Sequence, residues 1–315
     1  MITNDSALNI CKFLNDKSKI RFLSTTSALD KLKTKVTFRT QLTTKQIEHL
    51  PYFNQFTQIF LENAADRIPS NVKIVNVRKD FDGLIEMLQL YKNIRYIHFE
   101  SDFKQEIKDK LPPNVKYLSF QSYYEHFYPG AIPDSVTTMI ITGGYDSSWF
   151  TGYKRDAHWI PDTVTNLTIR YNYGHAIRLS PNLTHLSVNF SKRHISSIPP
   201  NLKFLRITYH EGDTYIIPPT VERLHIQQSG DFPVNFIPLG IKYLTVTSLY
   251  GTNFNVPNNL PESIQYLYLH DYTYPFSLSI FPQSLKILAV GLKNYYCLAS
   301  RNEQRHGLKI KKLND

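Results

Sequence analysis

The stretch that decides the fold of this chain is Ile198-Pro-Pro-Asn-Leu-Lys-Phe-Leu-Arg-Ile207. It consists of an apolar residue, Pro, any residue and a small polar residue, followed by the pattern apolar-x-x-apolar-x-apolar. The same phrase returns as Ile217-Pro-Pro-Thr-Val-Glu-Arg-Leu-His-Ile226 and as Leu260-Pro-Glu-Ser-Ile-Gln-Tyr-Leu-Tyr-Leu269. Earlier copies occupy residues 68–77 and 111–120. A phrase that recurs at intervals of about 20 residues indicates a repeat architecture.

The alignment of the copies is set by the first apolar residue after the small polar one, which we call the anchor. The anchors are Val72, Ile94, Val115, Val136, Val164, Leu183, Leu202, Val221, Ile241, Ile264 and Leu285. Pro lies three residues before nine of these eleven anchors, and the residue directly before the anchor is always Asn, Ser, Thr or Gly. Positions +3 and +5 after the anchor are apolar in every copy.

Each column of the phrase has a physical reason. Pro has a fixed φ and no N–H, so it belongs in the turn that enters a strand. We expect the small polar residue to tighten this turn through local side-chain hydrogen bonds or through a positive φ. The apolar residues at +3 and +5 predict a short strand with one buried face. Because about twenty residues suffice for one strand and a return path, successive strands must stack in parallel, as in a leucine-rich-repeat solenoid.

The return path is expected to change along the chain. Residues 80–90 carry apolar side chains at helical spacing behind Asp80, a candidate N-cap, and residues 103–111 show the same spacing. From Ile132 onward, Pro, Gly, Asn and aromatic residues predict extended segments or single turns. Residues 56–61 predict one degenerate strand that caps the N-terminal end of the ladder.

The first fifty residues lack the period. Apolar stripes over residues 8–14, 20–23 and 28–32 predict two or three short helices, with a break at Asn15-Asp16. So small a helical unit buries little apolar surface alone, and we expect it to dock on the solenoid or on a partner.

The predicted organisation is α+β, with a helical domain at residues 1–50, a parallel β solenoid of about 11 to 12 repeats at 51–291 and a basic cap at 292–315. The formal net charge of +10 is concentrated in the first and last parts. The first part holds nine Lys and Arg against four Asp and Glu, and the last holds six against two, whereas the solenoid holds 21 against 20. Nucleic-acid-binding proteins usually carry a basic stripe along their body, so this distribution argues against nucleic acid as the main partner.

Several classes of protein are disfavoured by the sequence. Two cysteines, Cys11 and Cys297, cannot form a disulfide framework or a four-thiolate zinc site. No stretch approaches the roughly 18 uninterrupted apolar residues of a membrane span, and the segment Met1–Ala7 is polar and acidic rather than signal-like. His210-Glu211 lacks the second His of a zinc hydrolase motif, and no phosphate loop or dinucleotide fingerprint is present. We therefore expect a non-enzymatic, cytoplasmic protein without metal, cofactor or membrane attachment.

Two sets of residues carry a resemblance to a known family. The first is Ile10-Cys-Lys-Phe-Leu-Asn-Asp-Lys-Ser-Lys-Ile-Arg-Phe-Leu-Ser24 followed by Leu29-Asp-Lys-Leu-Lys33, which resembles a shortened F-box. The second is the repeated phrase together with Phe232-Pro-Val-Asn-Phe-Ile-Pro238 and Phe254-Asn-Val-Pro257, which is similar to FNIP repeats. Over nearly its whole length the chain resembles the F-box and FNIP repeat proteins of social amoebae and of giant DNA viruses that infect amoebae.

This resemblance implies an adaptor function. The F-box-like part would bind a Skp-type adaptor of a cullin-RING ubiquitin ligase, and the repeats would hold a protein substrate, in the host cytoplasm if the chain is viral. The adaptor-facing candidates are Leu8, Ile10, Phe13, Leu14, Ile20, Phe22 and Leu23. The alternative for each of these residues is a place in the core of its own domain.

Two alternatives to the ligase function stay open. The first is a stand-alone protein-binding repeat scaffold with a degenerate F-box. The second is electrostatic contact of the two basic ends with nucleic acid or a membrane surface. In each case we expect the chain on its own to be a monomer.

Substrate-binding candidates come from positions +2, +4 and +6, which point away from the core onto the expected concave face. Tyr, Arg and His gather there, and these residue types suit protein interfaces. The densest patch is Phe204, Arg206, Arg223, His225, Tyr243, Tyr266, Tyr268 and His270. The alternative is that the aromatic residues at +2 stack along the ladder for stability.

One interval between anchors, from Val136 to Val164, is 28 residues long and holds both tryptophans, Trp149 and Trp159. Loops that interrupt a solenoid often carry binding residues, so both are candidates for a binding loop. The alternative is a buried plug over the neighbouring repeat.

Overall fold

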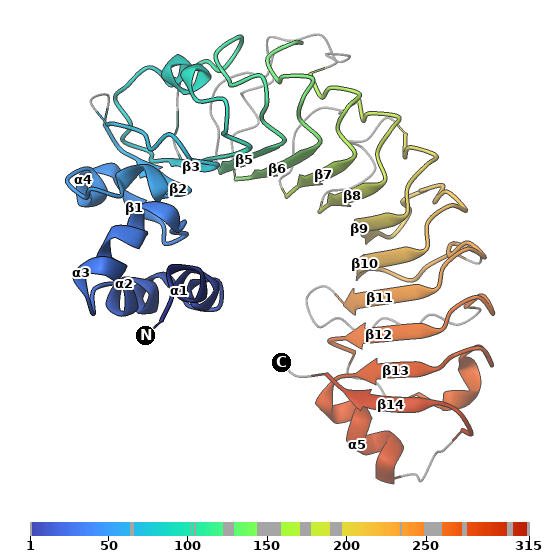
Figure 1. The fold of residues 1–315 in the computed structure, drawn as a ribbon. Coiled ribbons are helices and arrows are strands. Elements are labelled where there is room, and N and C mark those ends of the chain that lie inside the picture. Colours follow the sequence, from blue (N-terminus) through green and yellow to red (C-terminus); the bar gives the residue numbers. More distant parts are fainter. Residues whose placement is uncertain are drawn as a thin grey trace. The chain divides into compact units, whose positions relative to one another are not determined.

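A computed structural model gives the structure of the chain, and Figure 1 shows the order of its helices and strands. It describes residues 2–63, 66–101, 103, 105–121, 129–143, 159–170, 178–189, 197–233, 235–248, 260–272, 276–300 and 305–313. The chain divides into two compact units, Met1–Gly144 (unit 1) and Tyr145–Asp315 (unit 2).

Unit 1 begins with short helices, and a side chain caps the first turn of each of the first three α-helices. These helices are α1 (Asn4–Cys11), α2 (Asp16–Leu23), α3 (Ser27–Asp30) and the 3-10 helix η1 (Lys31–Lys35) (Figure 1). Thr3, Asn15 and Thr26 each accept a hydrogen bond from a first-turn amide, which is the stabilising arrangement of an N-cap. The predicted break at Asn15 is therefore the start of the second helix.

A parallel ladder follows these helices in unit 1. Its strands are β1 (Leu42–Thr43), β2 (Gln58–Leu61), β3 (Ile74–Val77), β4 (Tyr96–Phe99), β5 (Tyr117–Gln121) and β6 (Thr138–Thr142), each paired in parallel with the next. The connections contain α4 (Thr44–Ile47) and the 3-10 helices η2 (Phe53–Gln55) and η3 (Ile85–Leu90). The predicted capping strand is β2, and the ladder extends one strand further to β1.

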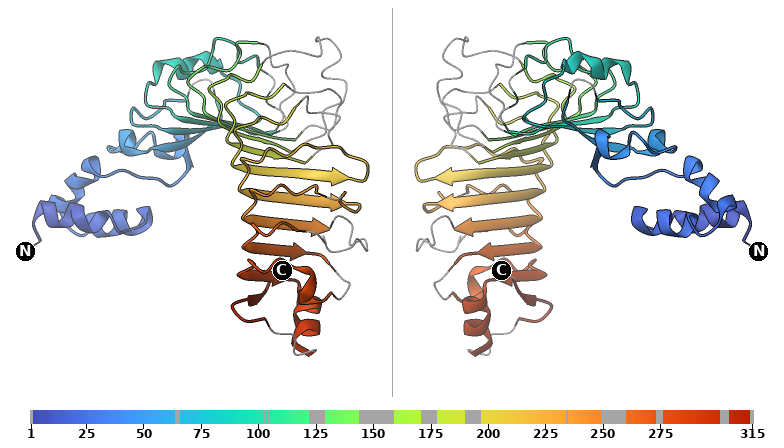
Figure 2. Two further views of the ribbon diagram at one scale, coloured as in Figure 1. Left: turned by 90° about the vertical axis from the view of Figure 1, so that its right-hand side faces the viewer. Right: turned by 90° about the vertical axis from the view of Figure 1, so that its left-hand side faces the viewer.

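Unit 2 is a second parallel ladder of the same kind. Its strands are β7 (Asn166–Ile169), β8 (His185–Val188), β9 (Phe204–His210), β10 (Arg223–Ser229), β11 (Tyr243–Ser248), β12 (Tyr266–His270), β13 (Ile287–Val290) and β14 (Lys309–Lys312). Figure 2 shows β9 to β13 side by side as parallel rungs. The connections described near the C-terminal end contain η7 (Leu278–Ile280) and α5 (Leu292–Ser300). All eleven anchors are followed two residues later by the first residue of a strand, so the predicted parallel β solenoid is confirmed.

The core of each unit is built from the predicted apolar columns. The residues at the anchor, +3 and +5 are at most 3% exposed in all eleven repeats. Burying one such side chain stabilises the fold by about 1.5–3 kcal/mol, so the ladder is held mainly by these three columns. Most residues at +2 and +4 point to the opposite, accessible side.

Prolines form the turn that enters most of the strands. The carbonyl of the proline three residues before the anchor accepts a hydrogen bond from the anchor amide, at 3.1 Å between Pro69 and Val72 and at 3.1 Å between Pro218 and Val221. Because Pro has no N–H to donate, its place at the start of this turn leaves no strand hydrogen bond unmade.

At Thr220 and Ser284, the small polar residue before the anchor has a different role from the one expected. The hydroxyl of Thr220 donates to the carbonyl of Pro200 at 2.6 Å. The hydroxyl of Ser284 donates to the carbonyl of Ile264 at 2.8 Å. Both acceptors belong to the preceding repeat, so these side chains join neighbouring repeats instead of tightening their own turn.

Gly240 occupies the same column before Ile241. A Cβ at this position would lie 2.2 Å from the carbonyl oxygen of Pro219, again in the preceding repeat. The φ of Gly240 is not in the left-handed region. Glycine is therefore required here by the close approach of two backbones, not by a positive φ.

The return segments of unit 1 contain less α-helix than predicted. η3 is a 3-10 helix that starts at Ile85, and Leu84 precedes it, so Asp80 caps no helix. The described residues of 103–111 form no helix, although Phe103 and Ile107 are buried. A 3-10 helix rises about 2.0 Å per residue against about 1.5 Å for an α-helix, so it spans a short return with fewer residues.

Candidate functional site

The eight residues predicted as a patch on the repeats lie on β9, β10 and β12 with one on β11, and strand pairing arranges them in rows. The first row, at +2, contains Asn166, His185, Phe204, Arg223, Tyr243, Tyr266, Ile287 and Lys309. The second row, at +4, contains Thr168, Ser187, Arg206, His225, Thr245, Tyr268, Ala289 and Lys311. The third row, at +6, contains Arg170, Asn189, Thr208, Gln227, Thr247, His270 and Gly291. We call these three rows the unit 2 face.

The first row of the unit 2 face is a stack of rings and a guanidinium. The rings of His185 and Phe204 are stacked with centroids 6.0 Å apart. Arg223 lies over the ring of Tyr243 at 4.6 Å, and Tyr243 stacks on Tyr266 at 4.5 Å with an interplanar angle of 6°. Tyr243 is thus flanked by a cation on one side and by a parallel ring on the other, which stabilises the row. The row therefore shows the predicted stacking along the ladder, and such a stack can also form part of a binding interface.

The second and third rows bring basic groups together. His225 lies beside Arg206 in the register, and its Nε2 is 3.3 Å from the Thr247 hydroxyl. Burial, and then the charges of Arg206 and His270, lower the pKa of His225 to about 4, so this imidazole is neutral at pH 7. Burial and the charge of Arg170 lower the pKa of Arg206, which nevertheless stays protonated.

Charge on the unit 2 face has one sign. Its charged residues are Arg170, Arg206, Arg223, Lys309 and Lys311, and none of its residues is acidic. Within the described part of the chain, no carboxylate forms an ion pair with any of them. The glutamate nearest in sequence, Glu222, precedes β10 and binds Lys203 at 3.8 Å and Lys242 at 3.2 Å.

Lys309 and Lys311 were not predicted as part of the face. They pair with Ile287 and Ala289, so β14 extends both rows by one strand. The segment 309–312 has one apolar residue and no Pro before it, so it carries no signal of the repeat phrase.

The equivalent surface of unit 1 has paired charges. We call the outward residues of β2 to β6 the unit 1 face, which contains Gln58, Phe60, Glu62, Ile74, Asn76, Arg78, Tyr96, His98, Glu100, Tyr117, Ser119, Gln121, Thr138, Ile140 and Thr142. Arg78 lies 3.5 Å from Glu62, 3.4 Å from Glu100 and 4.0 Å from the ring centroid of Phe60. The rings of Tyr96 and Tyr117 are tilted by 40° at 5.5 Å.

The adaptor-facing candidates on the N-terminal helices differ widely in exposure. Phe13, two residues after the end of α1, is 89% exposed, and Ile10 is 39% exposed. Leu23 is fully buried and contributes to the core of the unit. The remaining candidates are half-buried, namely Leu8, Leu14, Ile20 and Phe22.

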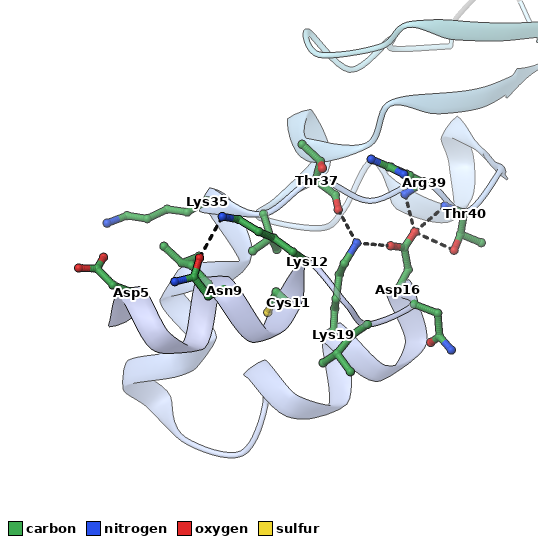
Figure 3. A pocket seen from close by; sticks show the side chains of 14 residues that line it. Asp5, Asn9, Cys11, Lys12, Asp16, Lys19, Lys35, Thr37, Arg39 and Thr40 are labelled. Atoms are coloured by element: carbon green, nitrogen blue, oxygen red, sulfur yellow. Dashed lines mark hydrogen bonds and ion pairs between the residues drawn. The ribbon is translucent and has the colours of Figure 1, made fainter. Parts of the chain in front are cut away.

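Leu8 and Leu14 also line a pocket that the sequence did not indicate (Figure 3). The pocket has a volume of about 930 Å³ and lies between α1, the start of α2 and residues 35–40. Basic side chains, Lys12 and Lys35 among them, share its wall with these two leucines.

Asp16 connects α2 to the strand-forming part of unit 1 at the wall of this pocket (Figure 3). Its buried carboxylate accepts hydrogen bonds from Lys19 Nζ at 2.9 Å, from the amides of Arg39 and Thr40 and from the Thr40 hydroxyl. Lys19 also donates to the Thr37 carbonyl at 3.0 Å. Burial raises the pKa of Asp16, but the hydrogen bonds from Lys19 and from Thr40 and Arg39 outweigh it and lower that pKa. This network is structural, because every charge in it is already compensated.

The binding-loop candidates fall at the edge of the described structure. Trp159 is buried at 5% exposure, whereas Trp149 lies outside the described residues. Within the part of the chain that the structure describes, no group of three or more His, Cys, Asp or Glu is placed to hold a metal ion. No helix among the same residues has the length and apolar character needed to cross a bilayer.

Comparison with known families supports the repeat assignment. The FNIP Repeat family model matches residues 103–143 and 254–293. An FNIP repeat-containing protein of Acanthamoeba polyphaga mimivirus is 28% identical over 163 residues, which cover 46% of this chain and 39% of that protein. An F-box and FNIP repeat-containing protein of the same virus is 24% identical over 254 residues, which cover 56% of this chain and 85% of that protein. The chain thus spans less than half the length of the first of these relatives.

Two solved structures align with a large part of the chain. CroV588, a circular LRR protein, has a TM-score of 0.27 and 12% identity, covering 83% of this chain and 73% of its own. YopM from Yersinia enterocolitica WA-314 has a TM-score of 0.44 and 17% identity, covering 76% and 56%. The matched segments are FNIP repeats within the parallel β solenoid, and the chain is similar to FNIP repeat-containing and F-box and FNIP repeat-containing proteins of a giant virus.

Proposed function

We propose that this chain is a non-enzymatic adaptor that selects a protein substrate for a cullin-RING ubiquitin ligase. Its N-terminal helices would bind a Skp-type adaptor, and the unit 2 face would hold the substrate. The similarity to an F-box and FNIP repeat-containing protein supports the first half of this proposal. Such a complex would act in the cytoplasm.

The observation that carries the proposal is the exposure of Phe13. A phenylalanine that is 89% exposed, with Ile10 partly exposed one turn before it, loses most of the free energy that burial of its ring would provide. A partner helix or groove that covers both residues would recover about 2 kcal/mol from Phe13 alone. The helices hold this side chain outward because Ala7, Cys11 and Leu23 already fill their core.

The repeats supply the second surface. Aromatic, Arg and His side chains line the unit 2 face at fixed strand spacing, and these are the residue types that contribute most to protein interfaces. The chemistry of this face therefore supports binding rather than catalysis.

The proposal is tested with the full-length chain and a purified Skp-type adaptor, using isothermal titration calorimetry. We expect binding by the unaltered chain and a loss of at least about tenfold in affinity for Phe13→Glu. Leu90→Glu is the matched control, because Leu90 is 81% exposed in η3 of the same unit and lies outside the N-terminal helices. Absence of adaptor binding by the unaltered chain would overturn the ligase function and leave a stand-alone binding scaffold. An equal loss in both variants would remove Phe13 from the interface.

A further inference from the structure

We propose that the unit 2 face binds an extended, acidic segment of a protein. This inference rests on the proposed function in one respect, because it names the class of substrate that the repeats would hold.

Among the described residues, the basic groups of the unit 2 face have no carboxylate in an ion pair with them. Arg206 is half-buried on β9 with His225 beside it, and burial, followed by the charge of Arg170, lowers its pKa. A partly desolvated guanidinium without a carboxylate is costly, and a bound carboxylate would relieve that cost through a charge-assisted hydrogen bond. Arg78 of the unit 1 face, by contrast, already has Glu62 and Glu100.

The positions of the basic groups give the length of the ligand. Apart from Arg170, which follows β7, these groups stand on β9 (Arg206), β10 (Arg223) and β14 (Lys309 and Lys311). Neighbouring strands are about 4.8 Å apart, so five strand spacings from β9 to β14 cover about 24 Å. An extended peptide advances about 3.4 Å per residue, so a segment of roughly seven residues that runs across the strands would meet all of them.

The aromatic rings favour a peptide over a single-stranded nucleic acid. Binding of unpaired bases without sequence preference uses exposed ring faces as stacking platforms. Both faces of Tyr243 are covered, by Arg223 and by Tyr266, and one face of Phe204 is covered by His185. Tyr243, Tyr266 and Tyr268 are half-buried on this face, and a tyrosine hydroxyl can donate a hydrogen bond to a carboxylate or a backbone carbonyl.

The experiment measures fluorescence anisotropy of a labelled ten-residue peptide in which Glu alternates with Gly and Ser. The purified full-length chain is used without any adaptor protein. We expect saturable binding that weakens with salt, and a loss of about tenfold or more when Arg206→Gln is combined with Arg223→Gln. The same peptide with Gln in place of Glu should not bind.

A matched control separates a built site from general attraction. Lys203→Gln with Lys242→Gln removes the same charge from the same unit, but from residues that pair with Glu222 beside the face. This variant should keep at least half of the affinity, and circular dichroism should show that both double variants are folded.

Four results would overturn the inference. They are no binding of the Glu peptide, an equal loss in both double variants, binding of the Gln peptide as tightly as the Glu peptide, and tighter binding of a poly-deoxythymidine ten-mer than of the Glu peptide. The last result would assign the face to nucleic acid. Failure here leaves adaptor binding through Phe13 intact, and failure of adaptor binding leaves this result intact, so the two proposals are tested separately.

Discussion

The two faces share one framework and differ in how their charges are compensated. On the unit 1 face, Arg78 is held between Glu62 and Glu100 and covers the ring of Phe60. On the unit 2 face, Arg206 has His225 beside it and Arg170 near it, and no carboxylate pairs with it among the described residues. Since the buried columns are equally apolar in both units, the ladder does not require this difference. The contrast teaches that the repeat fixes positions on its face but leaves their charge open to selection for binding.

The largest expected difference is the response of the two faces to acid. His225 and His98 both occupy +4, but the pKa of His225 is lowered to about 4 by burial, Arg206 and His270, whereas burial lowers the pKa of His98 against the opposing effect of Glu100. A folded pKa below the unfolded value of about 6.5 means that the unfolded state takes up the proton first. Stability is therefore complete above about pH 6.5 and falls as the pH drops toward 4, by up to about 2 kcal/mol at pH 5.

Hydrogen-exchange mass spectrometry of the β10 and β11 amides at pH 7 and pH 5 checks this prediction. The measured rates are corrected for the pH dependence of intrinsic amide exchange. His225→Gln should lose less stability than the unaltered chain over that interval. His98→Gln is the control, and it should leave the loss of stability of unit 2 between pH 7 and pH 5 unchanged. The same loss in His225→Gln as in the unaltered chain would contradict the assignment to His225.

A second contrast concerns the stacked rows. Tyr243 stacks flat on Tyr266 and contacts Arg223, whereas Tyr96 is tilted against Tyr117 and is 46% exposed. We expect Tyr243→Ala to lower the free energy of unfolding by about 1 kcal/mol more than Tyr96→Ala. Urea denaturation followed by far-ultraviolet circular dichroism measures both, and equal losses would mean that the flat stack adds nothing to burial.

Removing the acids of unit 1 should make its face behave like that of unit 2. Glu62→Gln with Glu100→Gln leaves Arg78 without a carboxylate and should lower the free energy of unfolding by about 0.5–1 kcal/mol. The variant should also bind the Glu peptide more tightly than the unaltered chain in fluorescence anisotropy. Glu222→Gln, which removes an acid beside the unit 2 face, serves as the comparison and should produce the smaller gain. Unchanged affinity in the unit 1 variant would show that charge alone does not distinguish the faces.

Adding a carboxylate to the unit 2 face is the reverse change, and we expect it to have the smallest effect on the free energy of unfolding. His225→Glu places a carboxylate beside Arg206 in the register, as Glu100 stands near Arg78. We expect the thermal midpoint at pH 7 to rise slightly, corresponding to roughly 0.5 kcal/mol, together with weaker binding of the Glu peptide. A lower midpoint would show that the site cannot accept an ionised side chain of its own.

The ladder could be predicted from the sequence because each apolar position of the repeat phrase corresponds to a buried position of a strand. The anchor, +3 and +5 columns identified every strand from β3 to β13. The sequence could not predict β1 or β14, because strands as short or as polar as Leu42–Thr43 and Lys309–Lys312 pair through the backbone and leave no apolar pattern. The helix expected after Asp80 was wrong in type and start, since apolar spacing does not separate a 3-10 turn from an α-helix over so few residues.

The candidate sites were harder to predict than the fold. The patch around Tyr243 followed from strand geometry, so its members were found by counting positions. The exposure of individual side chains could not be predicted by counting positions. Phe13 and Leu23 both belong to the apolar stripes of the N-terminal helices, yet Phe13 is 89% exposed and Leu23 is fully buried. The pocket beside Asp16 depends on contacts between residues more than twenty positions apart, which no local pattern encodes.

The hydrogen bond from Thr220 to Pro200 has a consequence for how this chain can change in length. Each such turn residue reaches back to one repeat and no further. Excision of residues 202–220 would join Asn201 directly to Val221, so every later anchor would remain in phase. Arg223 would then stand beside His185 instead of Phe204. Gain or loss of a whole repeat by recombination therefore changes which face residues lie side by side on adjacent strands. The residues of the turns and of the core keep the same kinds of partner.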